Sequence, residues 1–396
     1  MESKQRAFPW PKFGTIMGEE EIQAAATVIR ECAATGKPMT RGDRLTAFEE
    51  AFAEYVGAEY AIATNSCATA LLTTVRALDI GPGDEVITTP NTHLSTATGV
   101  LEVGAQPLFV DIDSETLNLD PSKIEAKITS KTRAIYPVHY AGLPADLDPI
   151  HDIARKHGLS VVEDAAHAPG AEYRGKRIGG LSDLTCFSFQ TQKNMSTLGE
   201  GGMITTNNSD LAERCRKIRS FGTQRYADQP NPWTPWHYDV VMLGTNFRMT
   251  EPAAAVGLVQ LRRLDELTQR RRAIAAYYTQ ALSGRTGVRT PCEPEGYKHT
   301  YHIYNLLLDE AEAGAARIDV LEEMKTAYRV DSVIHYKPVY LFDLFQERGY
   351  HEGECPVAER LFRQIVGLPL HPSYTEEDCA YIVEAVKDAL TSCRGR

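Results

Sequence analysis

Short apolar runs alternate with helix-like segments through the first half of the chain. Seven runs of four to eight residues are rich in apolar and β-branched side chains; they cover residues 60–64, 86–89, 107–112, 132–139, 159–163, 184–189 and 203–206. Helix-start signals such as Asp120-Pro121 and Ser209 lie between several of them. Apolar runs of this kind are typical of strands buried on both faces. The pattern therefore predicts an α/β fold with a mostly parallel, seven-stranded sheet between helices.

Helical periodicity dominates the chain on both sides of these strands. Two helices are expected before the sheet, at about 19–32 and at 43–56. A long helix is expected from Thr250 to about Leu282, with a basic cluster at 270–272. A strand at 301–308 and helices at 318–328, 357–365 and 375–390 would follow as a small α+β unit.

These elements predict an N-terminal arm over 1–36, a large domain over 37–260 and a smaller C-terminal domain over 261–396. The segment 224–244 is rich in Pro, Trp and Tyr and fits no regular pattern. Long irregular segments in compact domains are often binding loops or lids. We therefore expect this segment to contribute to binding.

Composition narrows the class of protein. The chain is 43% hydrophobic and 24% charged, with a formal net charge of −11, which argues against a nucleic-acid partner. It carries no apolar run of membrane-spanning length and no signal-like N terminus, so no membrane partner and a cytoplasmic location are expected. Its eight cysteines form no Cys-x-x-Cys pair, so neither a metal site nor a disulfide scaffold is expected.

The stretch from Ser188 to Gly202 carries the first candidate for chemistry. Lys193 follows an apolar strand and lies among small neutral residues before a glycine-rich turn. A lysine near packed apolar surroundings loses part of its preference for the charged form and becomes an amine nucleophile. A solvated surface lysine is the alternative. Ser188, five residues earlier, could donate its hydroxyl to a phosphate.

Two further strand ends carry suitable polar groups. Asp164 directly follows a strand and could hold a protonated ring nitrogen, although a helix N-cap is an equally simple interpretation. The turn Ser66-Cys67-Ala68 precedes a helix, whose free N–H groups and dipole suit a phosphate. Many structural turns share that composition. His167, by itself, would be a buried core histidine more often than a catalyst.

A fourth candidate lies ahead of the long helix, where Asn246 and Arg248 could bind an anion or Thr250 could simply cap the helix. Together, a phosphate anchor, an aspartate for a ring nitrogen and a lysine for an aldehyde describe a site for pyridoxal 5'-phosphate. The chain has no Gly-x-Gly-x-x-Gly after its first strand and no P-loop motif, which excludes the dinucleotide and P-loop interpretations.

These residues resemble the sugar aminotransferases of the DegT/DnrJ/EryC1/StrS family, which are pyridoxal-phosphate enzymes of fold type I. The resemblance runs from about Gly36 to the C terminus and is highly specific in combination. It rests on Glu163-Asp164-Ala165-Ala166-His167, Ser188-Phe189, Lys193-Asn194, Gly199-Glu200-Gly201-Gly202, Asn246 and Arg248 before Met249-Thr250, and Gly367-Leu368-Pro369-Leu370-His371-Pro372.

The resemblance implies a homodimer with shared active sites. It makes Lys193 the Schiff-base lysine and proton carrier, Asp164 the partner of the pyridine nitrogen, and His167 a neighbour of the ring. Ser188 and the turn Ser66-Cys67-Ala68 would hold the phosphate. Asn246 would reach the phosphate bound by the neighbouring subunit.

Two positions depart from the family pattern. His93 takes the place where Phe or Trp usually stacks on the cofactor ring. A histidine can also stack there, but it could instead titrate or contact substrate. Ala68 replaces the usual threonine of the phosphate turn, so we expect Thr69 or the backbone to substitute.

The resemblance implies ping-pong transfer of an amino group from glutamate or glutamine to a keto-sugar, with a nucleotide-linked acceptor favoured. A keto-cyclitol of the scyllo-inosose type is the alternative acceptor, and a catalytically silent, cofactor-binding regulator is the alternative class. Lys193 argues against the dehydratase branch, which uses histidine, and no cysteine lies in the mobile loop that a desulfurase needs. Candidate acceptor contacts are Trp233 and its loop up to Tyr238, Tyr301, His302, His335 and Tyr336, for each of which plain packing is an alternative.

Overall fold

The computed structural model describes residues 6–225 and 238–395. The seven predicted strands form one sheet, in the order β1-β9-β8-β5-β4-β2-β3. Strand β9 is antiparallel to both of its neighbours, and the other pairs are parallel. The strands are β1 (Tyr60–Thr64), β2 (Glu85–Thr88), β3 (Gln106–Phe109), β4 (Thr132–Tyr136), β5 (Ser160–Asp164), β8 (Leu184–Ser188) and β9 (Gly202–Thr206). The predicted fold class is therefore confirmed.

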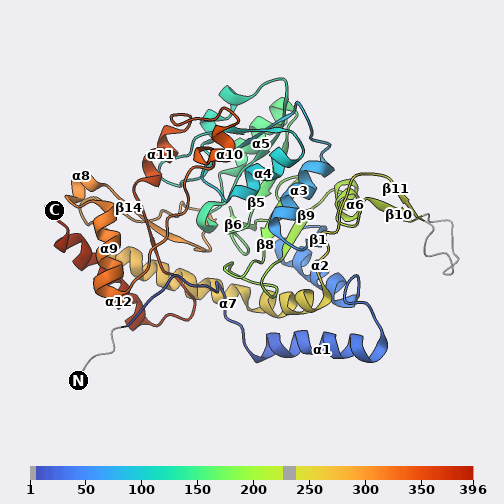
Figure 1. Ribbon diagram of the computed structural model, residues 1–396, viewed down its shortest axis with the longest axis horizontal. Coiled ribbons are helices and arrows are strands. Elements are labelled where there is room, and N and C mark those ends of the chain that lie inside the picture. Colours follow the sequence, from blue (N-terminus) through green and yellow to red (C-terminus); the bar gives the residue numbers. More distant parts are fainter. Residues whose placement is uncertain (1–5, 226–237, 396) are drawn as a thin grey trace.

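Helices cover both faces of this sheet because its side chains alternate between them. Val162 and Ile204 pack in one apolar cluster with residues of α3 (Cys67–Ala77), α4 (Leu94–Glu102) and α6 (Ser209–Ile218). On the opposite face, Phe187 packs against α2 (Asp43–Val56) and α7 (Glu251–Leu282), and Val161 packs against α5 (Leu147–His157). Figure 1 shows these helices around the central strands.

Helix α7 is a single helix of 32 residues that connects two cores. Leu264 belongs to the core beneath the large sheet, whereas Ile274 belongs to the core of the C-terminal unit. The change from one core to the other occurs within this continuous helix. The expected domain boundary at 260/261 also lies inside α7.

The C-terminal unit contains a three-stranded antiparallel sheet, in the order β12-β14-β15. Its elements are β12 (Val288–Arg289), β14 (Tyr304–Leu308), α8 (Glu310–Ala313), α9 (Arg317–Tyr328), α10 (Asp343–Gln346), α11 (Pro356–Phe362), β15 (Ile365–Leu368) and α12 (Glu376–Ser392). The prediction of a helix over 357–365 was wrong at its C-terminal end. Helix α11 ends at Phe362, and Ile365 begins β15 because this segment pairs with β14. The expected strand at 301–308 begins only at Tyr304, since Tyr301 has a φ of 46° and turns the chain.

The N-terminal arm links both units. Phe8 packs in the C-terminal core and bridges Val330, on the side of the molecule where Figure 1 places α12. Six residues further along the arm, the N–H of Gly14 donates a hydrogen bond of 2.9 Å to the carbonyl of Thr191. The arm then enters α1 (Glu19–Thr35), which packs along α7. The arm therefore runs directly beside the loop that carries Lys193.

The segment 224–244, which was expected to be irregular, contains β-strand residues that pair with one another. Strands β10 (Thr223–Arg225) and β11 (Tyr238–Val240) form an antiparallel hairpin at the periphery of the molecule (Figure 1). A third small sheet joins β6 (Glu172–Tyr173), β7 (Lys176–Arg177) and β13 (Tyr297–Lys298). Within the described ranges, no helix is long and apolar enough to cross a membrane.

Candidate active site

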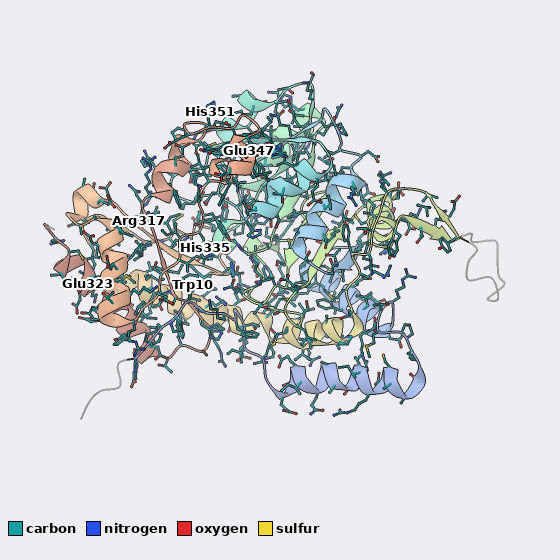
Figure 2. All side chains as sticks on the ribbon, viewed as in Figure 1. Trp10, Arg317, Glu323, His335, Glu347 and His351 are labelled. Carbon is teal, nitrogen blue, oxygen red and sulfur yellow. The ribbon has the colours of Figure 1, made fainter. Side chains whose placement is uncertain are left out.

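A cavity of about 360 Å³ lies at the carboxyl ends of β5 and β8, where ligands bind in sheets of this kind. It brings together residues that are far apart in the sequence. Those predicted from the sequence are Ser66, Cys67, Ala68, His93, Asp164, Ser188, Lys193, His302, His335 and Tyr336. His335 is labelled in Figure 2, between the C-terminal unit and the large sheet.

Lys193 lies in a loop that folds back on itself after β8. The N–H of Phe189 donates to the carbonyl of Gly201, and the N–H of Thr191 donates to the carbonyl of Gly199, each at 2.8 Å. Gly199 has a φ of 113°, which a residue with a side chain rarely adopts. Burial lowers the pKa of Lys193, and the negative charge of Asp164 partly opposes that shift. The amine is therefore easier to deprotonate than a surface lysine.

Asp164 is a buried carboxylate that faces the cavity, with only 3% of its surface exposed. Its Oδ2 accepts a hydrogen bond from Thr96 Oγ1 at 2.6 Å, and its Oδ1 accepts one from the N–H of Ala166 at 3.1 Å. No helix begins after Asp164, so the N-cap interpretation was wrong and a turn follows instead. Among the described residues it has no ion-pair partner. A buried carboxylate in this state fits the protonated pyridine nitrogen of pyridoxal phosphate.

The turn before α3 fits the phosphate of the same cofactor. Ser66 caps the helix by accepting the N–H of Thr69 at 3.2 Å, which leaves Cys67 and Ala68 as the first two helical residues. The Thr69 hydroxyl donates to Asn65 Oδ1 at 2.7 Å and does not line the cavity. The backbone, rather than Thr69, is therefore placed to substitute for the hydroxyl that Ala68 lacks.

Two neighbours shape this turn. Ser188, at the end of β8, is buried and lines the same cavity. A Cβ on Gly202 would lie 2.4 Å from the carbonyl oxygen of Ser66 and 2.7 Å from the nitrogen of Cys67. Only glycine allows β9 to approach the turn this closely.

Neutral histidines and a tyrosine line the side of the cavity that faces the C-terminal unit. His167 Nε2 and the Tyr336 hydroxyl are 3.0 Å apart, and the rings of His167 and His302 are 4.4 Å apart. Burial holds the pKa of His167 and of His302 well below the usual range, and it lowers the pKa of His335 to about 4. At neutral pH these rings are therefore uncharged and can act as hydrogen-bond donors and acceptors.

His93 precedes α4, and its side chain lines the cavity. Its Nδ1 is 2.8 Å from the hydroxyl of Ser95, which fixes the ring beside Asp164 and Lys193. Loss of hydration and the positive charge of Lys193 both lower the pKa of His93. A neutral ring at this position suits stacking better than a charged one would.

Among the predicted residues that the structure describes, His167, Tyr301 and Asn246 do not line this cavity. His167 lies behind Tyr336 and His302, which do line it. Tyr301 turns away, stacks on His299 at 3.9 Å and donates to Glu293 Oε2 at 3.3 Å. Asn246 is exposed, next to the bridge that it forms with Ser220. Trp233 lies outside the described residues.

Sequence reasoning missed several residues of the site. Thr96 orients Asp164, and Ser95, Gln190, Gln192 and Glu200 line the cavity. Burial raises the pKa of the Glu200 carboxyl, and the positive charge of Lys193 partly opposes that rise. The only sequence signal was position: Ser95 and Thr96 lie in the first turn after His93, and Gln190, Gln192 and Glu200 flank Lys193.

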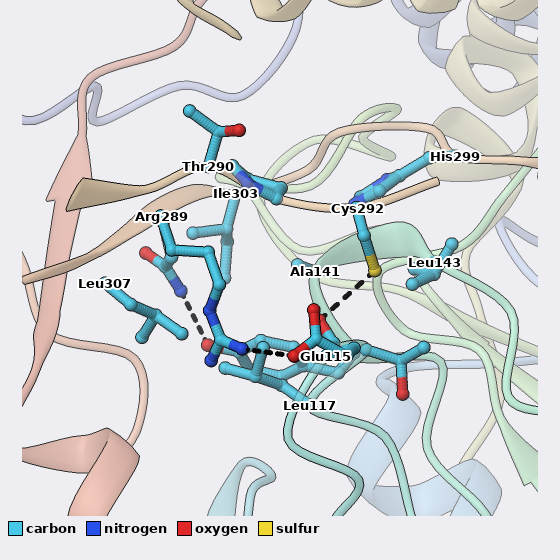
Figure 3. A pocket seen from close by; sticks show the side chains of 14 residues that line it. Glu115, Leu117, Ala141, Leu143, Arg289, Thr290, Cys292, His299, Ile303 and Leu307 are labelled. Atoms are coloured by element: carbon cyan, nitrogen blue, oxygen red, sulfur yellow. Dashed lines mark hydrogen bonds and ion pairs between the residues drawn. The ribbon is translucent and has the colours of Figure 1, made fainter. Parts of the chain in front are cut away.

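A separate small cavity of about 30 Å³ lies between Glu115, Arg289 and Cys292 (Figure 3). Glu115 and Arg289 form an ion pair of 2.6 Å across it, and Cys292 Sγ is 3.2 Å from the Glu115 carbonyl. Burial raises the pKa of Cys292, so its thiol stays protonated and unreactive at neutral pH. The described part of the chain also contains no His, Cys, Asp or Glu group suited to a metal ion.

Comparison with known proteins shows similarity over most of the chain. The sequence model of the DegT/DnrJ/EryC1/StrS aminotransferase family matches residues 16–387. The spore coat polysaccharide biosynthesis protein SpsC of Bacillus subtilis (strain 168) is 40% identical over 377 residues, which are 95% of each protein. The dTDP-3-amino-3,4,6-trideoxy-alpha-D-glucose transaminase of Streptomyces venezuelae is 36% identical, and the match covers 88% of this chain and 87% of that enzyme.

Comparison with solved structures also finds similarity to a sugar aminotransferase. The PLP form of the putative sugar aminotransferase Spr1654 from Streptococcus pneumoniae has a TM-score of 0.88 and 28% identity, with 98% of this chain and 100% of that chain covered. The chain thus belongs to the DegT/DnrJ/EryC1/StrS aminotransferase family and is a pyridoxal-phosphate-dependent sugar aminotransferase.

Proposed function

We propose that this enzyme moves an amino group from glutamate or glutamine to a nucleotide-linked keto-sugar by a ping-pong mechanism, with Lys193 as the Schiff-base lysine. The observation that carries the proposal is the convergence of Lys193, Asp164 and the start of α3 on one cavity. The similarity to a transaminase of a dTDP-linked sugar supports a nucleotide-linked acceptor. A free keto-cyclitol is the alternative acceptor.

When bound, pyridoxal phosphate supplies an aldehyde that accepts the amine and a ring that withdraws electrons from the reacting carbon. Asp164 would hold a proton on the ring nitrogen, because Thr96 and the N–H of Ala166 orient its carboxyl group within the cavity. Lys193 lines the same cavity as Asp164, so its amine would be within reach to carry the proton from the donor's α-carbon. The same groups act in reverse on the acceptor.

We infer that two copies of the chain share their active sites. Asn246 lies outside the cavity of its own subunit, which fits a role in the neighbouring one. The segment before it exposes Val240, Val241 and Leu243, the last with 86% of its surface exposed. Apolar side chains this exposed are typical of an interface. The molar mass of the holoenzyme in solution tests this inference, which a monomer would contradict.

The proposed reaction divides into two halves that absorbance can follow. We expect the purified holoenzyme to be yellow and to lose that colour when glutamate or glutamine is added. Adding a nucleotide-linked keto-sugar should restore the colour, whereas a keto-cyclitol should not. Restoration by the cyclitol alone would replace the proposed acceptor with the alternative one. An unchanged spectrum with both amino acids would exclude both proposed donors.

A further inference from the structure

A second, smaller chamber adjoins the active-site cavity. It has a volume of about 40 Å³ and is closed by Trp10 and Gly14 of the N-terminal arm and by Arg271 of α7. Gln192, His302 and His335 line both the chamber and the cavity, so the two spaces share a wall. Figure 2 shows Trp10 and His335 close together in projection, and their rings are 5.4 Å apart. The chamber therefore lies directly behind the Lys193 loop.

Arg271 is a buried cation that lacks a counter-charge. Only 1% of its surface is exposed, and no carboxylate of the described residues lies within ion-pair distance of it. Its Nη1 donates to the carbonyl of Tyr301 at 3.1 Å, and its Nη2 donates to the carbonyl of Gly14. Its Nε is buried without a hydrogen-bond partner.

An unpaired charge and an unused donor are both costly inside a protein, and both favour a bound anion. Burial lowers the pKa of Arg271 to about 9, so the side chain still carries its charge at neutral pH. The adjacent Arg270 is different, because it is exposed and forms an ion pair of 2.6 Å with Glu266. The anion-binding features therefore belong to Arg271 and not to the basic cluster as a whole.

We propose that this chamber binds a carboxylate group of the amino donor, with Arg271 as its cationic partner. This inference rests on the proposed aminotransferase function, which requires an amino acid beside Lys193. The chamber has room for a few waters or one carboxylate, but not for a sugar ring or a diphosphate. His335 Nδ1 is also buried without a partner and offers a second polar contact. The neutral rings of His302 and His335 add no competing charge.

The location of the chamber explains how a donor carboxylate and the reacting amine are held together. Gln192 lies between the two spaces and is only one residue from Lys193, and its Nε2 is fixed by the Pro11 carbonyl at 3.2 Å. A donor anchored at Arg271 would thus present its amino group on the Lys193 side. The nucleotide-linked acceptor would have to occupy the larger cavity, so the two substrates would depend on different residues.

The test is the binding of glutarate, an unreactive dicarboxylate, to the holoenzyme by calorimetry. Glutaramide, its neutral counterpart, is the matched control ligand, and inorganic phosphate at the same concentration tests for nonspecific anion binding. We expect wild-type enzyme to bind glutarate and not glutaramide. We expect Arg271→Gln to bind glutarate about 10- to 100-fold more weakly, the effect of losing a hydrogen bond to a charged group. Arg270→Gln, on the exposed neighbour, should bind glutarate as wild type does.

Kinetics separate this role from a purely structural one. Arg271→Gln should raise the half-saturating glutamate concentration and leave that of the acceptor unchanged; an equal rise for both substrates would overturn the proposal. If this variant does not fold, Leu370→Phe narrows the same chamber while Arg271 stays in place, and it should weaken glutarate binding too.

The same measurements distinguish the chamber proposal from the proposed function. Wild-type enzyme that loses its colour with glutamate but does not bind glutarate, or binds it no better than phosphate, contradicts carboxylate binding in the chamber while the aminotransferase function stands. If glutarate binds and no amino acid changes the colour, the proposed function fails instead.

Discussion

The proposed cofactor side and the proposed substrate side of the active site are built from different parts of the chain. The proposed cofactor side consists of residues at or just after the carboxyl ends of strands in one mostly parallel sheet: Ser66, Cys67, Ala68, Asp164, Ser188 and Lys193. The substrate side consists of Gln192, His302, His335 and Tyr336, supported by Arg271 and the N-terminal arm. One side is set by regular strand geometry, whereas the other depends on contacts between segments hundreds of residues apart.

This difference predicts that changes on the cofactor side abolish the chemistry, whereas changes on the substrate side alter affinity and selectivity. In the proposed reaction, charged groups on the cofactor side take part in every turnover, whatever the substrate. Groups on the substrate side are neutral, apart from Arg271, and interact through hydrogen bonds worth about 0.5–1.5 kcal/mol each. Variants on the two sides should therefore separate clearly in size of effect.

The largest effect is expected for Lys193→Ala. Loss of the amine removes both the covalent attachment and the proton carrier, so kcat should fall by about 10⁴-fold or more. Circular dichroism should show an unchanged fold. Lys176→Ala, on an exposed lysine of β7, is the matched control. Activity of Lys193→Ala close to that of wild type would rule out the assigned role.

Asp164→Asn should have the next largest effect. The amide keeps the shape of the side chain and can still accept from Thr96, but it cannot hold a proton on the ring nitrogen by charge. We expect kcat to fall by about 10²- to 10³-fold, with cofactor still bound. Asp152→Asn, at an exposed position of α5, should leave kcat unchanged. A loss of less than threefold would mean that the charge of Asp164 is not required.

His299→Gln should alter stability in acid rather than activity. Burial, helped by the charge of Arg272, lowers the pKa of His299 to about 3, against about 6.5 in an unfolded chain. Below about pH 6.5 the unfolded chain takes up a proton that folded His299 cannot, so stability falls as the pH falls. Between pH 7 and pH 5 this contributes about 2 kcal/mol.

Thermal unfolding of wild type and His299→Gln at these two pH values measures that contribution. The variant should lose less of its melting temperature on acidification than wild type does. Exposed His351, replaced by Gln, gives the matched control, with a pH response equal to that of wild type. Equal responses of wild type and His299→Gln would show that His299 does not resist protonation.

The smallest effect is expected for Tyr336→Phe. The substitution removes the hydroxyl that lies 3.0 Å from His167 Nε2 and leaves the ring in place. A loss of about 1 kcal/mol corresponds to a roughly fivefold fall in kcat/KM for the acceptor, with the donor half-reaction unaffected. A fall as large as that of Asp164→Asn would contradict the division between the two sides.

The two sides also differ in how far they can be predicted from sequence. Asp164 and Lys193 follow recognisable strands, so the rule that ligands bind beyond the carboxyl ends places them together. On the substrate side, local patterns cannot decide between neighbours: His302 lines the cavity, but Tyr301 turns towards Glu293. The basic cluster at 270–272 likewise suggests three solvated side chains, whereas the structure buries Arg271 completely. Which of these side chains is buried or lines the cavity depends on tertiary contacts, including those with the N-terminal arm. The local periodicity of apolar residues carries no information on such contacts.

The most direct test of the account is rapid-mixing absorbance of the yellow holoenzyme with glutamate and with glutamine, in wild type and Lys193→Ala. The account predicts that at least one amino acid removes the yellow colour of wild type within the time of one turnover, and that a keto-sugar linked to a nucleotide restores it. Lys193→Ala should not complete this cycle. A wild-type spectrum that neither amino acid changes, with cofactor bound, would contradict the proposed reaction.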